Sequence, residues 1–425
     1  MSWFQPQRKR EIVKIKAIVA NVLHLVFPTD DSYDATTFNV YVGELHLAGP
    51  VRVSGVSFRG RGGYNNDERD RTPPGVHIEG VDGAVISDCR FDDFTNQHAR
   101  MTYCVRSEIT GCAIGGIDLS NEDNISGSDT SKWFTGLSID SCHDVRVLGN
   151  TCSNARRLID LQGGVNDPGS RHILVASNTV TNCGNGVGMH RCARVSIVGN
   201  KFIGVKDGIS IRGKNVTITG NTIRATEDAI VVNPGSYLTP PGYDDGPGVN
   251  FGDLVIEGND IECQRYFFVS KYNFDSITIT NNKFRIINNI SGSSMPRVGW
   301  QGRRLSRFTF AGNDVVCPNT SPIIRIYQQQ AGQIVELGDI SVTHNKFRGG
   351  RRVLDITGLD SPNEAEKTVF AFNECYGAAN PVPIVEIGGG NFANPVWIAY
   401  NYIGDGRGNT ISGDSEKFVS VGNVW

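Results

Sequence analysis

Residues 195–223 read VSIVGNKFIGVKDGISIRGKNVTITGNTI, and one phrase both opens and closes this stretch. The phrase is an alternating apolar run, often a glycine, and then Asn-x-apolar. Alternation with a period of two predicts a strand with one buried face. Further copies run from VRVLGNTC at 145–152 to VSVGNVW at 419–425, and their asparagines lie 21 to 38 residues apart. Repetition at this period predicts a solenoid, in which each coil buries its apolar face against its neighbours.

The asparagine of each copy is expected to stack on the asparagine of the next coil. A stacked side-chain amide can donate a hydrogen bond along the column and satisfy turn groups that would otherwise be buried without a partner. The column consists of Asn150, Asn178, Asn200, Asn221, Asn259, Asn282, Asn313, Asn345, Asn373, Asn401 and Asn423. Three weaker copies precede it, with Val56, Cys89 and Cys112 in the same place. The chain is therefore predicted to be all-β, a single-stranded right-handed parallel β-helix solenoid of about 14 coils with an Asn ladder.

The residue two positions after each asparagine is apolar and is predicted to line the core. These residues are Cys152, Val180, Phe202, Ile223, Ile261, Phe284, Val315, Phe347, Cys375, Ile403 and Trp425. The ten cysteines include no CxxC pair, and most fall at inward positions of the repeat. We therefore interpret them as reduced core residues.

Composition excludes several classes of partner. A formal net charge of -3 provides no basic footprint for nucleic acid, and no apolar run is long enough to cross a membrane. No phosphate-binding loop, nucleophile elbow or zinc spacing is found, so neither a cofactor nor a metal is expected. No signal peptide is recognised, because the apolar stretch 18–27 is interrupted by Asn21 and His24.

The repeat divides the chain into residues 1–40, an N-terminal cap or attachment segment, and residues 41–425, the β-helix. The last copy ends at Trp425. A final coil with unpaired strand groups invites pairing. We therefore expect a homo-oligomer, most simply a trimer, or docking to a larger assembly.

The strand repeat and the asparagine column resemble the pectin-lyase-like right-handed β-helix superfamily over roughly residues 40–425. The resemblance implies the architecture, whereas the superfamily includes polysaccharide lyases, glycoside hydrolases, epimerases and phage tailspikes. Galacturonan hydrolases of this fold carry Asn-Thr-Asp, Asp-Asp, Gly-His-Gly and Arg-Ile-Lys on successive strands. Here Gly188-Met189-His190 and Ile211-Arg212 match only in part, and the paired Asp-Asp is missing.

A second strand in each coil follows its own alternating pattern, so its outward residues should form columns on one sheet face. One column reads Ser138, Asp160, Gly188, Ser210, Val231, Val269, and continues later with Arg325, Asp355 and Glu386 as a second patch. The next column reads Asp140, Gln162, His190, Arg212, Asn233, Lys271. A third, just before the strand, reads Arg157, Asn185, Asp207, Asp228, Tyr266.

These columns predict a polysaccharide groove, in which Asp140 and Asp160 are the candidate carboxyl pair for glycoside hydrolysis. His190 is the candidate base of a uronate elimination, with Arg212 neutralising the sugar carboxylate. The candidate substrate-binding residues are Gln162, Asn233, Lys271, Asp207, Asp228, Tyr237 and Tyr243. Two simpler interpretations stay open: a solvated sheet face, and ordinary turn chemistry for Asp207 and Asp228.

Three functions fit these features. The first is a virion-associated, tailspike-like β-helix that binds, and in one version cleaves, a host surface polysaccharide. The second is a free-standing polysaccharide lyase, glycoside hydrolase or epimerase, located in the cytoplasm or secreted without a recognisable signal peptide. The third is a structural or decoration β-helix without a ligand.

Overall fold

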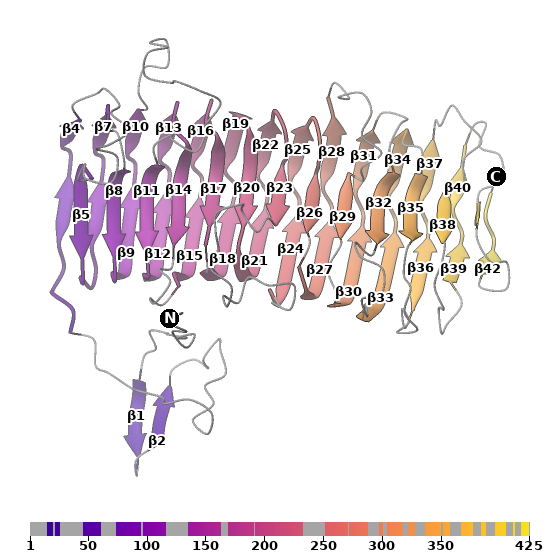
Figure 1. Ribbon diagram of the computed structural model, residues 1–425, viewed down its shortest axis with the longest axis horizontal. Coiled ribbons are helices and arrows are strands. Elements are labelled where there is room, and N and C mark those ends of the chain that lie inside the picture. Colours follow the sequence, from indigo (N-terminus) through magenta and orange to yellow (C-terminus); the bar gives the residue numbers. More distant parts are fainter. Residues whose placement is uncertain are drawn as a thin grey trace, which may run out of the picture.

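The computed structural model describes residues 15–19, 22–25, 46–60, 74–94, 97–115, 135–162, 169–190, 192–232, 251–270, 272–287, 297–300, 304–317, 322–327, 336–349, 352–357, 367–376, 384–387, 396–404, 411–412 and 418–424. Coils stack into a rod that runs from β4 and β5 at one end to β42 at the other (Figure 1). Each complete coil contributes one strand to each of three parallel sheets.

Sheet I contains the alternating strands that precede the asparagines. Among the described residues it has 14 strands: β3 Arg52–Ser54, β6 Val85–Ser87, β9 Val105–Thr110, β12 His143–Leu148, β15 Arg171–Ala176, β18 Cys192–Val198, β21 Gly213–Thr219, β24 Asp253–Glu257, β27 Phe274–Thr280, β30 Arg304–Ala311, β33 Glu336–Thr343, β36 Thr368–Ala371, β39 Val396–Ala399 and β42 Phe418–Val421. This number agrees with the prediction of about 14 coils.

Sheet II contains the short strands that follow the asparagines. In the described part of the chain its strands number 13: β4 Ser57–Arg59, β7 Arg90–Asp92, β10 Ala113–Gly115, β13 Thr151–Ser153, β16 Thr179–Thr181, β19 Lys201–Val205, β22 Thr222–Ala225, β25 Asp260–Cys263, β28 Lys283–Ile286, β31 Asp314–Cys317, β34 Lys346–Gly349, β37 Glu374–Tyr376 and β40 Tyr402–Ile403.

Sheet III contains the second alternating strand of each coil. Thirteen strands of this sheet lie among the residues that the structure describes: β5 Val76–Glu79, β8 Gln97–Thr102, β11 Thr135–Asp140, β14 Arg157–Gln162, β17 Asn185–Met189, β20 Asp207–Ile211, β23 Ile230–Val232, β26 Phe268–Ser270, β29 Val298–Trp300, β32 Pro322–Tyr327, β35 Arg352–Thr357, β38 Val385–Ile387 and β41 Ile411–Ser412. The predicted all-β parallel β-helix is confirmed.

The predicted asparagine ladder is confirmed from Asn150 to Asn423. In each step the side-chain Nδ2 donates to Oδ1 of the next asparagine at 2.9–3.0 Å. The same Oδ1 also accepts the main-chain N–H of the preceding asparagine. Before the ladder starts, Cys112 takes the same place, and its N–H donates to Asn150 Oδ1 at 2.9 Å. The ladder therefore satisfies buried groups in the turn between sheets I and II.

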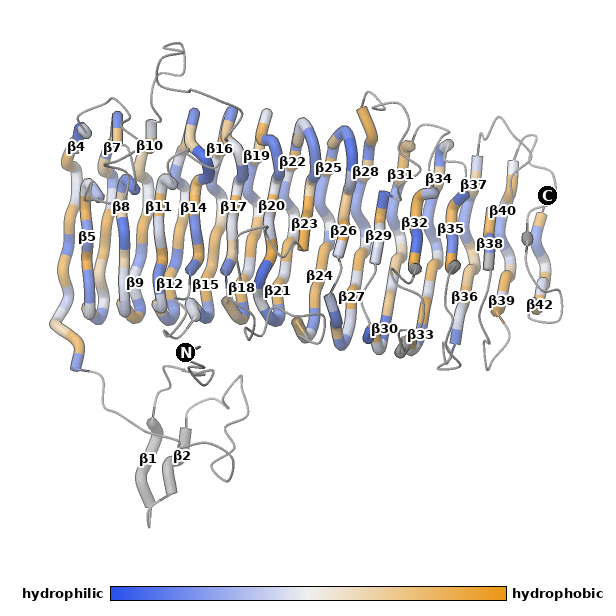
Figure 2. The backbone as a smooth tube through the Cα atoms, in the orientation of Figure 1, coloured by the Kyte–Doolittle hydropathy of each residue, from blue (hydrophilic) through white to orange (hydrophobic). Residues whose placement is uncertain are grey.

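The predicted apolar column lies inside sheet II, where its members face one another on successive coils. From Cys152 to Ile403 all its members are buried, whereas Trp425 lies outside the described residues. Polar and apolar residues alternate along the strands (Figure 2), and the apolar ones form one continuous core. All ten cysteines belong to this core as buried thiols. Among the described residues there is no helix with the length and apolar character needed to span a bilayer.

The N-terminal segment contains β1 Ile15–Val19 and β2 Val22–Leu25, which pair with each other in an antiparallel two-stranded sheet. In the part of the chain that the structure describes, this hairpin joins none of the three sheets of the rod (Figure 1). Its role as a cap or attachment segment stays a prediction.

The residue before each ladder asparagine adopts a left-handed backbone. Glycine fills this place in many coils, for example Gly199 and Gly220 with φ of 63° and 64°, because glycine has no Cβ to clash there. In three C-terminal coils the residues are His344, Phe372 and Tyr400, with φ between 53° and 57°. Their rings stack at centroid distances of 5.0 and 5.3 Å. Ring stacking is favourable, so it offsets part of the cost of the left-handed backbone for an L-residue.

Candidate functional site

The first predicted column occupies the outward face of sheet III. Backbone pairing joins Ser138 to Asp160, Asp160 to Gly188, Gly188 to Ser210, Ser210 to Val231 and Val231 to Val269. Arg100 of β8 precedes Ser138 in the same column. In the second column Asp140 pairs with Gln162, and His190 and Arg212 directly follow β17 and β20.

Asp160 accepts hydrogen bonds on both carboxylate oxygens. Arg157 Nη1 donates to its Oδ1 at 2.8 Å, and Gln162 Nε2 donates to its Oδ2 at 2.6 Å. Burial favours the neutral acid, but Arg157, His190 and the Gln162 bond together outweigh burial and hold the pKa of Asp160 below its usual value. Asp160 is therefore an ionised carboxylate at neutral pH.

His190 lies between Asp160 and Arg212. Its Nε2 is 3.7 Å from Asp160 Oδ1, and its Nδ1 is 3.4 Å from Arg212 Nη1. An arginine can only donate, so we assign Nδ1 as the acceptor and place the ring proton on Nε2, toward Asp160. Burial lowers the pKa of His190. The ring is thus neutral at pH 7, and the nitrogen that a general base would use is engaged by Arg212.

Asp140 has a different environment from Asp160. Arg100 Nη2 lies 2.6 Å from its Oδ2, and Ser138 Oγ donates to its Oδ1 at 3.2 Å. Burial raises the pKa of Asp140 despite these two partners. The sequence interpretation missed Arg100 as a site residue, although its position between the buried Ala99 and Met101 places it on the outward face.

The two carboxyl groups are diagonal neighbours, as predicted. Asp140 pairs with Gln162, two residues beyond Asp160 on β14. Strand geometry therefore separates their Cα atoms by about 8 Å. Both residues are 5% exposed, so they lie behind the more accessible side chains of Arg100 and His190, which are 38% and 40% exposed.

Gly188 makes room for Arg157. A Cβ at Gly188 would lie 2.2 Å from Arg157 Nη1 and 2.8 Å from its Cζ. Arg157 thus extends across the glycine to reach Asp160, and it is only 6% exposed. The glycine in the first column is therefore a packing requirement of the Arg157–Asp160 pair.

Asp207 and Asp228 lie on adjacent coils, where Asp228 N–H donates to Asp207 Oδ1 at 3.3 Å. Arg265 donates to both oxygens of Asp228, with Nε at 2.8 Å and Nη2 at 2.6 Å. Burial, and then the charge of Asp228, raise the pKa of Asp207 to about 6. Arg265 was not predicted as a site residue; it holds Asp228 in a bidentate pair of the kind that stabilises local structure.

The remaining predicted binding residues, Asn233, Lys271, Tyr237 and Tyr243, lie outside the described residues. No group of three or more His, Cys, Asp or Glu side chains that could hold a metal occurs among the described residues.

The second patch lies on β32, β35 and β38, where basic and acidic side chains form ion pairs with one another. Asp355 pairs in register with Arg325 on one side and Glu386 on the other. Arg325 Nε lies 3.1 Å from Asp355 Oδ2, and Arg352 bridges Asp355 and Glu386. Asp355 is fully buried, so it is not accessible to a ligand in this arrangement.

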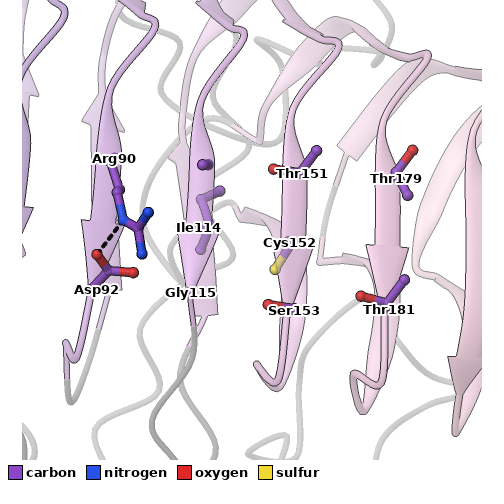
Figure 3. Close-up of a pocket in the computed structure, with 10 residues that line it drawn as sticks. Arg90, Asp92, Ile114, Gly115, Thr151, Cys152, Ser153, Thr179 and Thr181 are labelled. Atoms are coloured by element: carbon purple, nitrogen blue, oxygen red, sulfur yellow. Dashed lines mark hydrogen bonds and ion pairs between the residues drawn. The ribbon is translucent and has the colours of Figure 1, made fainter.

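A separate hollow of about 390 Å³ lies on sheet II (Figure 3). Its lining residues are Arg90, Asp92, Ala113, Ile114, Gly115, Thr151, Cys152, Ser153, Thr179 and Thr181. Small and hydroxyl side chains form its floor, and Arg90 Nε donates to Asp92 Oδ2 at 2.6 Å beside it. None of the predicted site residues lines it.

Comparison with known proteins supports the architecture. Residues 51–232 match the family model described as the right handed beta helix region. No curated protein matches the chain.

Solved structures of phage tailspikes are similar to the rod. A mutant tailspike protein of E. coli bacteriophage HK620, in complex with a pentasaccharide, has a TM-score of 0.51 and 10% identity over 88% of this chain and 71% of that chain. A second mutant of the same tailspike has a TM-score of 0.50 and 10% identity over the same shares. The tailspike protein of Pseudomonas phage LKA1 has a TM-score of 0.48 and 14% identity over 94% of this chain and 58% of that chain. At these identities the likeness concerns the fold, and the chain is a right-handed parallel β-helix similar in architecture to phage tailspike proteins.

Proposed function

We propose that this protein binds a host surface polysaccharide along the outward face of sheet III, from β8 to β20, as a tailspike-like component of a virion. The observation that carries the proposal is the row of partly exposed side chains Arg100, Gln162 and His190 in front of the buried carboxylates Asp140 and Asp160. Sugar hydroxyls both donate and accept hydrogen bonds. This row offers donors and acceptors on the coils of β8, β14 and β17, and adjacent coils are roughly 4.8 Å apart.

Preorganisation supports binding at this face. The two carboxylates are held by Arg100, Arg157, Ser138 and Gln162, so the exposed side chains are already ordered before a ligand arrives. The conformational entropy of these side chains is already lost on folding, so it does not reduce the affinity for a ligand. The pentasaccharide in the HK620 tailspike structure supports the same class of ligand. The similar fold also supports attachment to a virion, as a trimer or docked to a larger assembly.

The test of binding is an immobilised panel of acidic and neutral bacterial polysaccharides. We expect one glycan to be retained by the protein, and the Gln162→Ala and His190→Ala variants to bind it roughly three- to tenfold more weakly, as the loss of one or two hydrogen bonds predicts. Lys283→Ala, an exposed residue of sheet II, is the matched control and should bind as the wild type does. Retention of no glycan by the wild type, or equal losses in all three variants, would refute the proposal.

Glycoside hydrolysis is a second candidate, favoured by the contrast between Asp140 and Asp160. Their environments shift the two pKa values in opposite directions, as an acid and base pair requires. Asp140 would protonate the leaving glycosidic oxygen while Asp160 takes a proton from the water that attacks the anomeric carbon. The Cα atoms of these diagonal neighbours lie about 8 Å apart, a distance from which the two carboxyl groups can reach the roughly 6.5–9.5 Å separation that inversion uses.

Hydrolysis is tested by following the chain length of the retained glycan. We expect shortening by the wild type and a loss of about 100-fold or more in Asp140→Asn, because a positioned general acid contributes that much. A binding protein that leaves the glycan intact over prolonged incubation would exclude this candidate and leave the binding proposal in place.

A further inference from the structure

Basic residues are concentrated at the corner where sheet III passes into sheet I on four successive coils. The segments SCHD at 141–144, GSRH at 169–172, HRCAR at 190–194 and RGKN at 212–215 form this corner. We call it the basic corner. Its described basic residues are His143, Arg171, His172, His190, Arg194, Arg212 and Lys214. Among the described residues of these segments the acidic one is Asp144, and the buried Asp140 directly precedes the first segment.

Backbone pairing aligns these residues in two neighbouring columns. One column runs from His143 to Arg171 and on, past Ala193, to Lys214. The adjacent column holds His172 and Arg194, both in the left-handed turn that the corner repeats. His190 and Arg212 belong to the second column of the sheet III face and directly follow β17 and β20, so the basic corner is continuous with the proposed glycan site.

Several contacts within the corner join basic groups to one another, and His190 also faces the carboxylate of Asp160. The rings of His143 and His172 lie 4.8 Å apart, and Arg194 Nη1 lies 3.5 Å from His172 Nε2. Arg212 Nη1 likewise faces His190 Nδ1. Basic side chains are thus held side by side, and Arg194 and Lys214 are partly exposed.

Electrostatics then favours an anion at this place. Arg171, Arg194, Arg212 and Lys214 lie on three consecutive coils, within roughly 10 Å along the rod. The whole chain carries a formal net charge of -3, so attraction of an anion depends on a local group of basic residues such as this corner. Charges of one sign gathered on a surface raise the local concentration of the opposite ion.

We propose that the basic corner binds the acidic groups of the polysaccharide held on sheet III, so that the ligand is an anionic glycan. This inference rests on the proposed function. Carboxylate and phosphate groups share the required chemistry, since both accept hydrogen bonds from arginine. A glycan is favoured over nucleic acid because the corner spans only a few coils and adjoins the row formed by Arg100, Gln162 and His190.

The test compares alginate, a polymer of uronates, with the same alginate after reduction of its carboxyl groups, and with soluble polyphosphate. We expect the wild type to bind alginate at least about tenfold more tightly than the reduced polymer, with affinity falling as salt rises. In the double variant Arg194→Gln/Lys214→Gln this preference should fall by about tenfold, the loss expected for two partly exposed charges. Arg285→Gln, an exposed arginine of sheet II, is the matched control and should retain the preference.

Thermal unfolding of the double variant checks that the coils remain intact. Equal binding of alginate and reduced alginate would overturn the inference while leaving glycan binding on sheet III in place. Competition by duplex DNA as strong as that by alginate would also overturn it, because the corner would then be a nucleic-acid site. If neither polymer binds and the glycan panel is also negative, both proposals fail. Tighter binding of polyphosphate than alginate would support the inference with phosphate as the recognised group.

Discussion

The N-terminal and C-terminal coils share one interior but differ in their exteriors. From β8 to β20 the outward face of sheet III carries an ionic network built around Asp140 and Asp160. In the last coils exposed aromatic residues occur on sheet I and in the turn that follows it, with Phe372, Trp397 and Tyr400 each about half exposed at 50%, 46% and 55%. The difference shows that packing between neighbouring coils restricts the choice of amino acid at inward positions, whereas the residues at outward positions vary from coil to coil.

The ladder asparagines provide the largest expected effect, since they belong to the shared interior. In Asn200→Ala, the N–H and Nδ2 of Asn178 lose their acceptor, and the carbonyl of Val175 loses a donor. Buried polar groups without partners cost about 1–3 kcal/mol each, so we expect a loss of roughly 3–5 kcal/mol in the free energy of unfolding. Asn423→Ala, in a partly exposed turn, should cost about 1 kcal/mol. Urea denaturation measures the free energy of unfolding of both variants. Equal losses would contradict the view that the burial of each asparagine determines its contribution to stability.

Gly188→Ala tests the polar exterior of the N-terminal coils. The new Cβ would displace the Arg157 guanidinium and weaken its bond to Asp160. We expect a loss of about 2 kcal/mol in the free energy of unfolding, together with weaker glycan binding. Ser210→Ala, the next residue in the column, should change stability by less than about 0.5 kcal/mol. If the two variants unfold at the same urea concentration, the bond between Arg157 and Asp160 does not require a glycine at position 188.

Asp207→Asn provides a pH-dependent test of the same exterior. The folded pKa of Asp207 is raised to about 6 from its ordinary value of 3.8. Between these two pH values the folded state therefore holds a proton that the unfolded state releases. Its ionisation therefore costs stability as pH rises from about 4 to 6, and the cost persists at pH 7. We expect Asp207→Asn to stabilise the protein by about 1–2 kcal/mol at pH 7 and to have little effect near pH 4.

Urea denaturation at pH 4 and pH 7 measures this change. Asp228→Asn is the contrasting variant, because Asp228 is bound by Arg265 and its neutralisation should destabilise the protein at pH 7. A stabilisation by Asp207→Asn that is the same at both pH values would contradict the assignment to burial and the charge of Asp228.

Tyr400→Gly provides the smallest expected effect, at the aromatic exterior. Glycine relieves a left-handed backbone that costs about 1–2 kcal/mol for an L-residue, but it removes the stacking on Phe372, which contributes about 0.5–1.5 kcal/mol. These changes nearly cancel, so the free energy of unfolding should change by less than about 1 kcal/mol. A loss above about 2 kcal/mol would indicate that the ring contacts, rather than the backbone, dominate at this position.

The alternation and the recurring asparagine were sufficient to predict the strands, the ladder and the core column. Alternation also placed Asp160, Gly188 and Ser210 correctly in one outward column. What the pattern could not predict was which outward residues become buried. Asp140 and Asp160 are each 5% exposed. Arg100 of the neighbouring strand covers Asp140, and Arg157, three residues earlier on the same strand, covers Asp160.

The sequence by itself determined the repeat, because a period-two pattern and a stacked amide act locally and recur in every coil. Only the tertiary structure decided that Gly188 accommodates Arg157, that Arg100 reaches Asp140, and that the basic corner gathers on one edge. These contacts join coils separated by loops of variable length. Their geometry depends on how the side chains of successive coils pack together, which no local pattern encodes.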